Sequence, residues 1–322
     1  MMSRSLSMKR SSTATLFLTV AAVLSGCTAD QSPSSGTPSS AVTIKPEPEL
    51  YRGAAPELPL DTYSLTQAQK HDLEDAIYVL AKKCVEGFGG SWPEPADPAG
   101  AATAASRRYG VADERFVDKF GYSPPAPEGM SWTEIGQARE KSRERTAGIP
   151  EETRKVYTGE VSRSDGKKVP QGGCRGSAYR ALGMKGISVP YSDEVDRIAL
   201  SAWKESRDSE IVKRAARKWS QCMREAGYRY NTPEEVIEKP AWNLKDSPPS
   251  WVDLTKPSAG EVRTAVDDVR CKRNSLFIES WKAVETEEQK VALEEHRDLL
   301  KRARTTIKDL NVDVQRIIGA KQ

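Results

Sequence analysis

Apolar side chains recur at the i, i+3, i+4 spacing of amphipathic helices through most of the chain after Ser64. The first of these stripes ends before Gly89-Gly90. It consists of Leu73, Ala76, Ile77, Leu80, Ala81, Cys84, Val85 and Phe88. Apart from a short stretch at 161–169, no segment shows the alternation of a strand bounded by turn signals. The sequence therefore predicts an all-α fold.

Capping signals divide this region into separate helices. Ser64 with Gln67, Ser258 with Glu261, and Thr286 with Gln289 each resemble a capping box, and Ser192 and Ser209 are suitable N-caps. One or two short helices are also expected between 101 and 122. The other expected helices cover 64–88, 133–145, 150–157, 174–182, 193–206, 210–226, 233–242, 259–284 and 286–318.

The last expected helix is long and carries a stripe close to a heptad seam. Its inward positions are Ala292, His296, Leu299, Ala303, Ile307, Leu310, Val314 and Ile317. The flanking face is dense in Glu, Lys and Arg. The helix is expected either to form a hairpin with 259–284 or to leave part of its seam for a partner.

The first 26 residues have the regions of a secretory signal peptide. Arg4, Lys9 and Arg10 form a basic start, and residues 13–24 form an apolar run. A run of about a dozen residues is too short to cross a bilayer of about 30 Å, which needs about 20 residues. The segment is therefore predicted to be a signal peptide that is removed.

The apolar run ends in Leu24-Ser25-Gly26-Cys27. Small residues before a cysteine let an extended segment enter a peptidase, and the Cys27 thiol is the nucleophile that could accept a diacylglycerol group. The pattern resembles the lipobox of bacterial lipoproteins. That resemblance implies cleavage before Cys27 and a lipid anchor on the extracytoplasmic face of the cell membrane. Ordinary cleavage near Ala29, which would discard Cys27, is the alternative.

Residues 27–61 are predicted to be the lipidated N-terminus and a disordered linker. The segment is rich in Ser and Pro and offers few apolar side chains, so ordering it would cost backbone entropy with little burial in return. The helical domain is then expected to cover 62–320.

Two cysteines have similar surroundings in the sequence. Cys84 precedes Gly89 by five residues and Cys222 precedes Gly227 by five, and each is followed by a loop containing Trp and Pro. A later helix then carries a second cysteine in each case. We interpret the domain as two loosely repeated halves, about 62–190 and 191–320.

The four cysteines that remain after the signal and Cys27 are expected to form disulfides, because an exported chain meets an oxidising environment. Four cysteines permit three connectivities. The two-half interpretation favours the pairs Cys84–Cys174 and Cys222–Cys271.

Two segments in the second half are similar to a group of actinobacterial secreted lipoproteins. They are Trp-x-x-Cys-Met-x-x-x-Gly-Tyr at 219–228 and Ala-x-Asp-x-x-x-Cys-Lys at 265–272. The group has no known activity, so the resemblance implies location and fold only. The first half departs from it, since Val85 stands where Met would be expected.

Charge argues against nucleic acid as a partner. The full chain has 49 Lys and Arg against 46 Asp and Glu, and the three basic residues of the signal leave with it, so the mature chain is formally neutral. A phosphate backbone demands a basic surface, and a neutral, evenly mixed chain lacks that surface overall.

Catalytic and metal-binding patterns are missing from the sequence. His71 and His296 belong to no ligand-spaced cluster. Cys174 follows Gln171-Gly172-Gly173, which superficially resembles the nucleophile region of cysteine proteases but lacks its spacing and flanking aromatic residue. The adjacent acids Asp267-Asp268 and Glu294-Glu295 point to different sides of a helix and are expected to be solvated. The sequence predicts no catalytic residue, metal or cofactor.

Three functions fit these observations. The first is a non-enzymatic envelope protein that binds another protein or a wall component. The second is a small-molecule binder whose cleft is lined by Trp92, Trp219, Trp242 and Trp251. The third is an enzyme whose acidic site is assembled from residues that the sequence does not pair.

Overall fold

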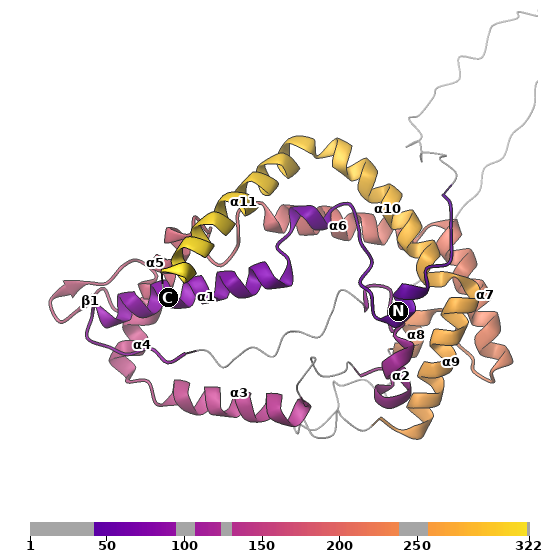
Figure 1. The fold of residues 1–322 in the computed structure, drawn as a ribbon, viewed down its shortest axis with the longest axis horizontal. Helices are drawn as coiled ribbons and strands as arrows, with labels where there is room; N and C mark the ends of the chain where they lie inside the picture. The colour runs from indigo at the N-terminus through magenta and orange to yellow at the C-terminus, as the bar shows by residue number, and fades with distance from the viewer. Residues whose placement is uncertain (1–41, 95–106, 124–130, 238–256, 321–322) are drawn as a thin grey trace, which may run out of the picture. The chain divides into compact units, whose positions relative to one another are not determined.

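The computed structural model describes residues 42–94, 107–123, 131–237 and 257–320. Within them the chain forms eleven α-helices, two 3-10 helices and one two-stranded hairpin, so the predicted all-α class is confirmed (Figure 1). The signal peptide, Cys27 and the linker up to residue 41 lie outside the described residues. So do Ala104, Ala105, Trp242 and Trp251, which the sequence assigned to helices or to a cleft.

The helices follow the predicted order along the chain. Their bounds are η1 Pro48–Arg52, η2 Asp61–Tyr63, α1 Gln67–Glu86, α2 Glu114–Phe120, α3 Trp132–Ala147, α4 Glu151–Thr158, α5 Gly173–Ala181, α6 Ser192–Arg207, α7 Glu210–Glu225, α8 Pro233–Ile237, α9 Ala259–Ser275, α10 Phe277–Glu295 and α11 Arg297–Gly319. The hairpin pairs β1 (Arg163–Ser164) with β2 (Lys167–Lys168), in the stretch exempted from the helical prediction. None of the described helices is both long and apolar enough to cross a membrane.

Three of the predicted caps are wrong, and one of them, Thr286 with Gln289, lies in the middle of α10. The capping box of α1 is made by Thr66 and Gln69, because Ser64 ends η2 in extended backbone and lies too early. Ser192 is already the first residue of α6, and its hydroxyl donates to the Val189 carbonyl oxygen at 2.8 Å instead. The cap of α7 is confirmed, since the Ser209 hydroxyl accepts from a backbone N–H at the expected place.

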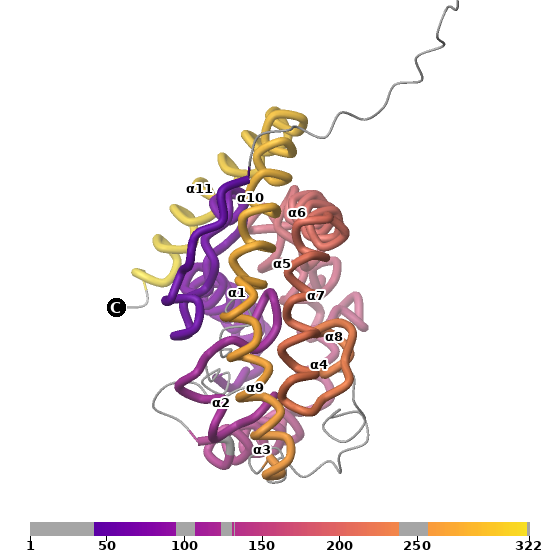
Figure 2. The backbone as a smooth tube through the Cα atoms, turned by 90° about the vertical axis from the view of Figure 1, so that its right-hand side faces the viewer, coloured from indigo at the N-terminus to yellow at the C-terminus, as the bar shows by residue number. Residues whose placement is uncertain are grey.

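The helices near the C-terminus break at places that the sequence did not predict. The expected junction near 284–286 lies inside α10, and the actual breaks fall at Leu276 and His296 (Figures 1 and 2). Leu276 has a φ of 53°, a left-handed conformation that costs a non-glycine residue roughly 1–2 kcal/mol. The turn is maintained because Phe277 and Trp281, directly after it, are buried in the largest hydrophobic cluster.

The expected linker is too long, because the chain joins the core from residue 42 onward. Leu50, Tyr51, Leu58 and Leu60 are buried. The Leu60 N–H donates to the Gln289 side chain at 2.9 Å, so this segment is held to α10 by polar contacts as well. The partners on α10 are remote in sequence, which is why composition alone suggested disorder.

The two expected halves, about 62–190 and 191–320, contact each other. Residues Val42–Gln322 form one compact unit, in which α11 packs on α1 and α2 packs on α9. Each pair joins an element of the first expected half to one of the second. The two disulfides nevertheless join Cys84 to Cys174 and Cys222 to Cys271, the pairs that the two-half interpretation favoured.

The long C-terminal seam is used inside the domain. Ala303, Leu310 and Val314 are buried, and α11 packs on α1 rather than forming a hairpin with 259–284. His296 is exposed at the break before α11, so its predicted inward position is wrong. Ile307 and Ile317 of the seam are only partly buried.

Candidate functional site

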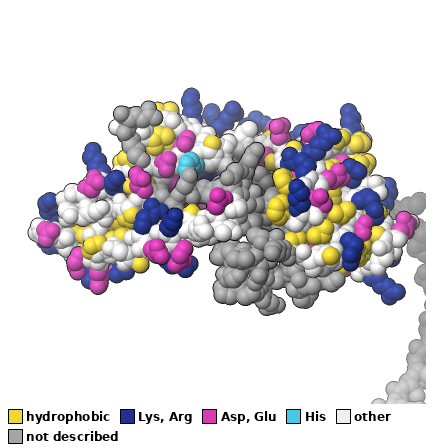
Figure 3. Space-filling view, turned by 60° about the horizontal axis from the view of Figure 1, so that its bottom comes forward, with side chains coloured by type: hydrophobic (Ala, Val, Ile, Leu, Met, Phe, Trp, Pro, Cys, Tyr) yellow, Lys and Arg dark blue, Asp and Glu magenta, His cyan; other side chains and the backbone are white. Residues whose placement is uncertain are grey.

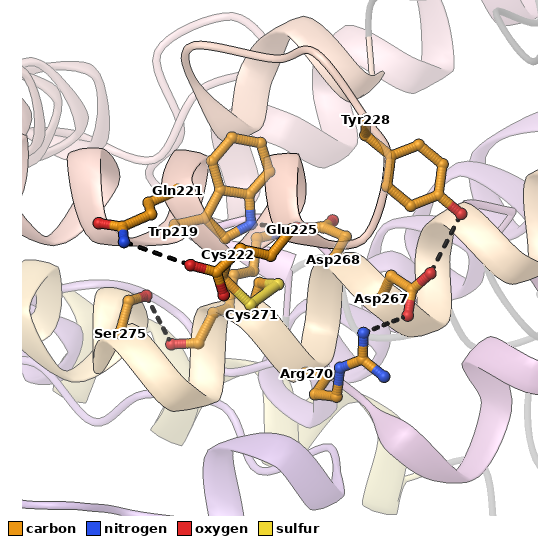
Figure 4. The surroundings of a disulfide bond; sticks show 11 residues. Trp219, Gln221, Cys222, Glu225, Tyr228, Asp267, Asp268, Arg270, Cys271 and Ser275 are labelled. Carbon is orange, nitrogen blue, oxygen red and sulfur yellow. Dashed lines mark hydrogen bonds and ion pairs between the residues drawn. A yellow bond between two sulfur atoms is a disulfide. The ribbon is translucent and has the colours of Figure 1, made fainter.

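A fully buried pair of charges lies beside the Cys222–Cys271 disulfide (Figure 4). The Asp268 carboxylate accepts from Trp219 Nε1 at 2.9 Å and from Lys272 Nζ at 2.9 Å, and the Tyr122 hydroxyl lies 3.3 Å away. The side chains of Asp268 and Lys272 are both 0% exposed. The prediction that Asp268 is solvated is therefore wrong, because the helical pair with Lys272 and the donor on α7 satisfy it inside the core.

The neighbouring acid, Asp267, lies on a different side of α9. It accepts from the Tyr228 hydroxyl at 3.1 Å and forms an ion pair with Arg270 at 2.7 Å, as Figure 4 shows. Adjacent helical residues point about 100° apart, so the two carboxylates cannot share a substrate. That part of the sequence prediction is correct.

The Asp268 network is closed by protein groups. Lys272 also donates to the Val111 carbonyl oxygen at 3.0 Å. Burial raises the pKa of Asp268, while Lys272 and the donors on Trp219 and Tyr122 oppose that rise. Because the carboxylate is fully enclosed and its acceptor sites are used, the network is suited to hold helices together and not to bind a ligand.

A second buried carboxylate, Glu285 on α10, is also fully engaged. It accepts from Arg108 Nε at 3.0 Å, from the Tyr109 hydroxyl at 2.9 Å and from Gln289 Nε2 at 2.8 Å. Burial raises the pKa of Tyr109, and the Glu285 charge adds to that effect. The sequence did not single out Glu285, although Ile278, Trp281, Glu285 and Gln289 share one helical face, a spacing that marks a buried position.

A third buried carboxylate ties the N-terminal segment to the same helix. Glu279 accepts from the Tyr51 hydroxyl at 2.9 Å and from the Glu47 N–H at 3.3 Å, and Lys282 pairs with the Glu47 carboxylate. Burial raises the pKa of Glu279. The helices α9 and α10 thus carry a row of buried acids whose partners come from distant segments.

The remaining residues weighed in the sequence do not form a chemical site. His71 is half-exposed and lies 3.9 Å from Asp75. Cys174 is buried in its disulfide with Cys84. Among the described residues, no group of three or more His, Cys, Asp or Glu side chains is placed to hold a metal ion.

The tryptophans expected to line a cleft are not brought together. Trp92 stacks on Tyr157 with ring centroids 3.6 Å apart, in the small cluster around Cys84–Cys174. Trp219 is fully buried in the largest cluster, which is a different one. Within the described part of the chain, a cleft lined by both is therefore absent.

A hollow of about 600 Å³ lies between α11, the end of α10 and the segment from η2 to α1. Its apolar lining is Leu293, Leu300 and Ile307, and Thr62, Tyr63 and Gln69 form the opposite wall. Four cationic side chains complete it, and no carboxylate belongs to the lining. We call this hollow the basic groove. Its cations are Arg297, Lys301, Arg304 and Lys308.

The cations of the groove share one face because of their spacing. They recur at i, i+4, i+7 and i+11, which places successive side chains about 5–6 Å apart along the helix. Arg297 is paired with Glu294. Among the described residues, Lys301, Arg304 and Lys308 have no carboxylate within ion-pair distance. The dense charge on α11 was visible in the sequence, but its opposite wall was not.

A smaller hollow of about 280 Å³ adjoins the groove and shares Tyr63 and Ile307 with it. Leu65, Val189 and Pro190 contribute to its lining, and Ile187 beside them is 77% exposed. We call this hollow the apolar pocket. It offers hydrophobic surface directly beside the positive charge.

The charged side chains that line the groove are all positive, unlike those on other parts of the surface. On the face shown in Figure 3, Lys and Arg side chains are interspersed with Asp and Glu side chains. Such a mixture gives little net attraction for a charged ligand, whereas a groove lined by one sign of charge concentrates its electrostatic field.

In comparisons with known proteins, no family model, no curated protein and no solved structure matches this chain.

Proposed function

We propose that the chain is a lipid-anchored protein on the extracytoplasmic face of the cell membrane, and that its helical domain binds another envelope component without catalysing a reaction. The observation that carries the binding role is the basic groove. Segments far apart in the sequence build a concave surface there, with four cations and no acid in its lining. Concave sites with a few convergent polar groups are the usual form of ligand sites.

The anchoring role rests on the sequence around Cys27. A thioether-linked diacyl group carries two acyl chains, and two chains give stable membrane attachment where a single chain does not. The two disulfides agree with an exported protein, because disulfides persist in oxidising compartments.

The absence of turnover is proposed from how the buried acids are used. The carboxylates of Asp268, Glu279 and Glu285 each accept hydrogen bonds from protein donors. A general acid or base must be able to reach a substrate proton. These three acids are instead engaged in holding α7, η1 and the segment before α2 to α9 and α10.

The anchor is tested by replacing Cys27 with Ser and fractionating cells. We expect the mature protein to move from the membrane fraction to the soluble extracytoplasmic fraction, or its precursor to accumulate. Thr28→Ala, one residue further on, is the matched control and should remain membrane-bound. Normal maturation and full membrane retention of Cys27→Ser would refute the anchor.

The binding role is tested by photo-crosslinking in intact cells. A photoreactive amino acid at Thr305 lies in the groove lining, and the same residue at Val312, which is 62% exposed on the same helix, lies outside it. We expect a discrete crosslinked species from position 305 and none from 312. Equal crosslinking at both positions, or none at either, would contradict a groove that binds an envelope component.

The apolar pocket supports a second candidate, the binding of a small apolar molecule. Leu65, Val189 and Pro190 in its lining suit such a ligand, with Lys70 and Asp196 as polar groups, and its volume of about 280 Å³ lies just below the usual range for ligand pockets. Replacing Val189 with Glu should abolish uptake of an apolar fluorescent probe if the pocket is used. Unchanged uptake by that variant would exclude this site.

A further inference from the structure

We propose that the basic groove binds an acidic oligosaccharide, a chain of sugars that carry carboxylate groups. The inference rests on the proposed function and names the ligand class of the same site. It follows from the length of the cationic row, from the neutral polar groups that face it, and from the apolar surface between them.

The cationic row selects a ligand with several negative charges. From Arg297 to Lys308 the helix rises about 16 Å, at 1.5 Å per residue, which is long enough to run beside more than one sugar unit. Since Lys301, Arg304 and Lys308 have no acidic partner among the described residues, an incoming anion displaces no existing ion pair at these positions. A single small anion would leave most of the row unused.

The neutral lining matches hydroxyl groups. Thr62 and Asn311 present a hydroxyl and an amide that both donate and accept hydrogen bonds, and Gln69 adds an amide whose oxygen already accepts from the Thr66 N–H at 2.9 Å. The Thr305 hydroxyl donates to the Lys301 carbonyl oxygen at 3.0 Å and keeps its acceptor capacity. A polyphosphate offers only acceptors, so it would leave the acceptors of this lining without donors. A sugar hydroxyl supplies both partners.

The apolar part of the lining fits the flat faces of sugar rings. The Tyr63 ring and the Ile307 side chain, both partly exposed, lie within the same hollow. Tyr63 is the one aromatic residue among its lining, whereas sequence-independent binding of single-stranded nucleic acid uses successive aromatic platforms. A flat bilayer surface would meet the rim cations but would not enter the groove.

The test is isothermal titration calorimetry on the full mature chain in neutral detergent. The probe is linear tetragalacturonate, with galacturonate and neutral maltotetraose as comparison ligands. We expect the tetramer to bind at least tenfold more tightly than either, because only it combines repeated carboxylates with hydroxyl groups. Affinity should fall as salt is raised, since exposed charges are screened.

Two triple variants separate the groove from net charge. Lys301→Gln, Arg304→Gln and Lys308→Gln remove three cations from the groove lining, and we expect at least a tenfold loss of affinity. Lys290→Gln, Arg302→Gln and Arg316→Gln remove the same charge from exposed positions outside the lining, and we expect less than a twofold loss. Circular dichroism melting confirms that both remain folded.

Several outcomes would overturn the inference. These are equal losses in the two triple variants, binding of maltotetraose as tight as that of tetragalacturonate, and binding of polyphosphate or of anionic phospholipid vesicles with none of the tetramer. The proposed function is judged separately: discrete crosslinking from position 305 without tetramer binding would reject the oligosaccharide and leave an envelope partner standing.

Discussion

The regions around the two disulfides look alike in sequence and are supported differently in the structure. In the Cys222–Cys271 region, α7 and α9 enclose Trp219, Met223 and the Asp268–Lys272 pair, all fully buried. In the Cys84–Cys174 region, α1 and α5 enclose small aliphatic side chains, and the aromatic pair beside them is only partly buried. The same covalent link therefore serves two different interiors.

The residue after each first cysteine shows the difference most directly. Val85 and Met223 both have no exposed surface, so the two positions are equivalent in burial. The larger Met belongs to the cluster that contains Trp219, Phe277 and Trp281, whereas Val85 clusters with Val156 and Val169. A region with less buried apolar volume is expected to depend more on its cross-link.

Removing the disulfides gives the largest expected effects. Cys84→Ala with Cys174→Ala opens a loop of 90 residues and should lower the free energy of unfolding by about 4 to 5 kcal/mol in the chain-entropy limit. Cys222→Ala with Cys271→Ala opens 49 residues and should cost about 4 kcal/mol in the same limit. Urea unfolding measures both.

Hydrogen exchange in the two variants measures how well each region stays folded without its disulfide. Without Cys84–Cys174, α4 and α5 should lose protection, because their cluster is small. Without Cys222–Cys271, α7 and α9 should keep theirs, since Trp219 and Lys272 still bind Asp268. Equal loss of protection in the two regions would show that the charged network gives no extra support.

Replacing Asp268 with Ala should cost about 3–5 kcal/mol, because it leaves the Lys272 ammonium buried without its carboxylate. Asp267→Ala is the matched control on the next residue, and it should cost less than about 1 kcal/mol because its ion pair is partly exposed. Chemical denaturation compares the two. Adding Lys272→Met to Asp268→Ala should restore part of the lost stability, because it removes the unpaired ammonium. If stability is not restored, the unpaired charge of Lys272 is not the cause of the loss.

Tryptophan substitutions should destabilise the two regions to different extents, with a smaller difference than the substitutions of the buried acids. Trp92→Leu removes the stacking on Tyr157 and should cost roughly 1 kcal/mol beyond the lost burial. Trp219→Leu also removes a donor to a buried carboxylate, so its cost should be larger, about 3 kcal/mol or more. Thermal melting with calorimetric enthalpies compares them, and a larger loss for Trp92→Leu would reverse the proposed ranking.

The smallest effect concerns pH and the Cys222–Cys271 side of the molecule. Burial raises the pKa of Glu279 in the folded state, so the folded protein holds this proton more tightly than the unfolded chain does. The free energy of unfolding should therefore fall as pH rises from about 4.3, the ordinary value for Glu, through the raised value. Relative to wild type, Glu279→Gln should gain stability over that interval.

An exposed acid with the opposite shift serves as the control. Hydrogen bonds from the Ser131 backbone and hydroxyl lower the pKa of Glu134, so Glu134→Gln should lose stability relative to wild type as pH rises. Urea titrations at pH 4, 6 and 8 follow both variants. The same sign of change in the two would contradict the assignment of burial as the cause for Glu279.

Much of the helical fold was predictable because it depends on local spacing. The stripe of α7 and its Ser209 cap are complete signals within a short segment. The breaks at Leu276 and His296 were not, since neither residue is a glycine or a proline. They are stabilised by contacts after the turn, such as the burial of Phe277, which the local pattern does not contain.

The buried charges and the groove were less predictable for a related reason. Asp268 and Lys272 stand four residues apart, a pair that is usually found on a solvated helix face. That face becomes internal because Trp219 from α7 and the segments that carry Val111 and Tyr122 contact it. The groove likewise combines cations that the sequence displays on α11 with a wall from Thr62 to Gln69, whose proximity depends on the packing of α1 against α11.

The attachment of the N-terminal segment to α10 also has a mechanical consequence. A pull on the chain at Val42 reaches η1 first, where Tyr51 and Glu47 are held by Glu279 and Lys282. With the proposed anchor at Cys27, tension on the N-terminus would be borne by the hydrophobic cluster that contains Tyr51 and Val42. The basic groove begins at Thr62, beyond these contacts along the chain, so it carries no load until they open.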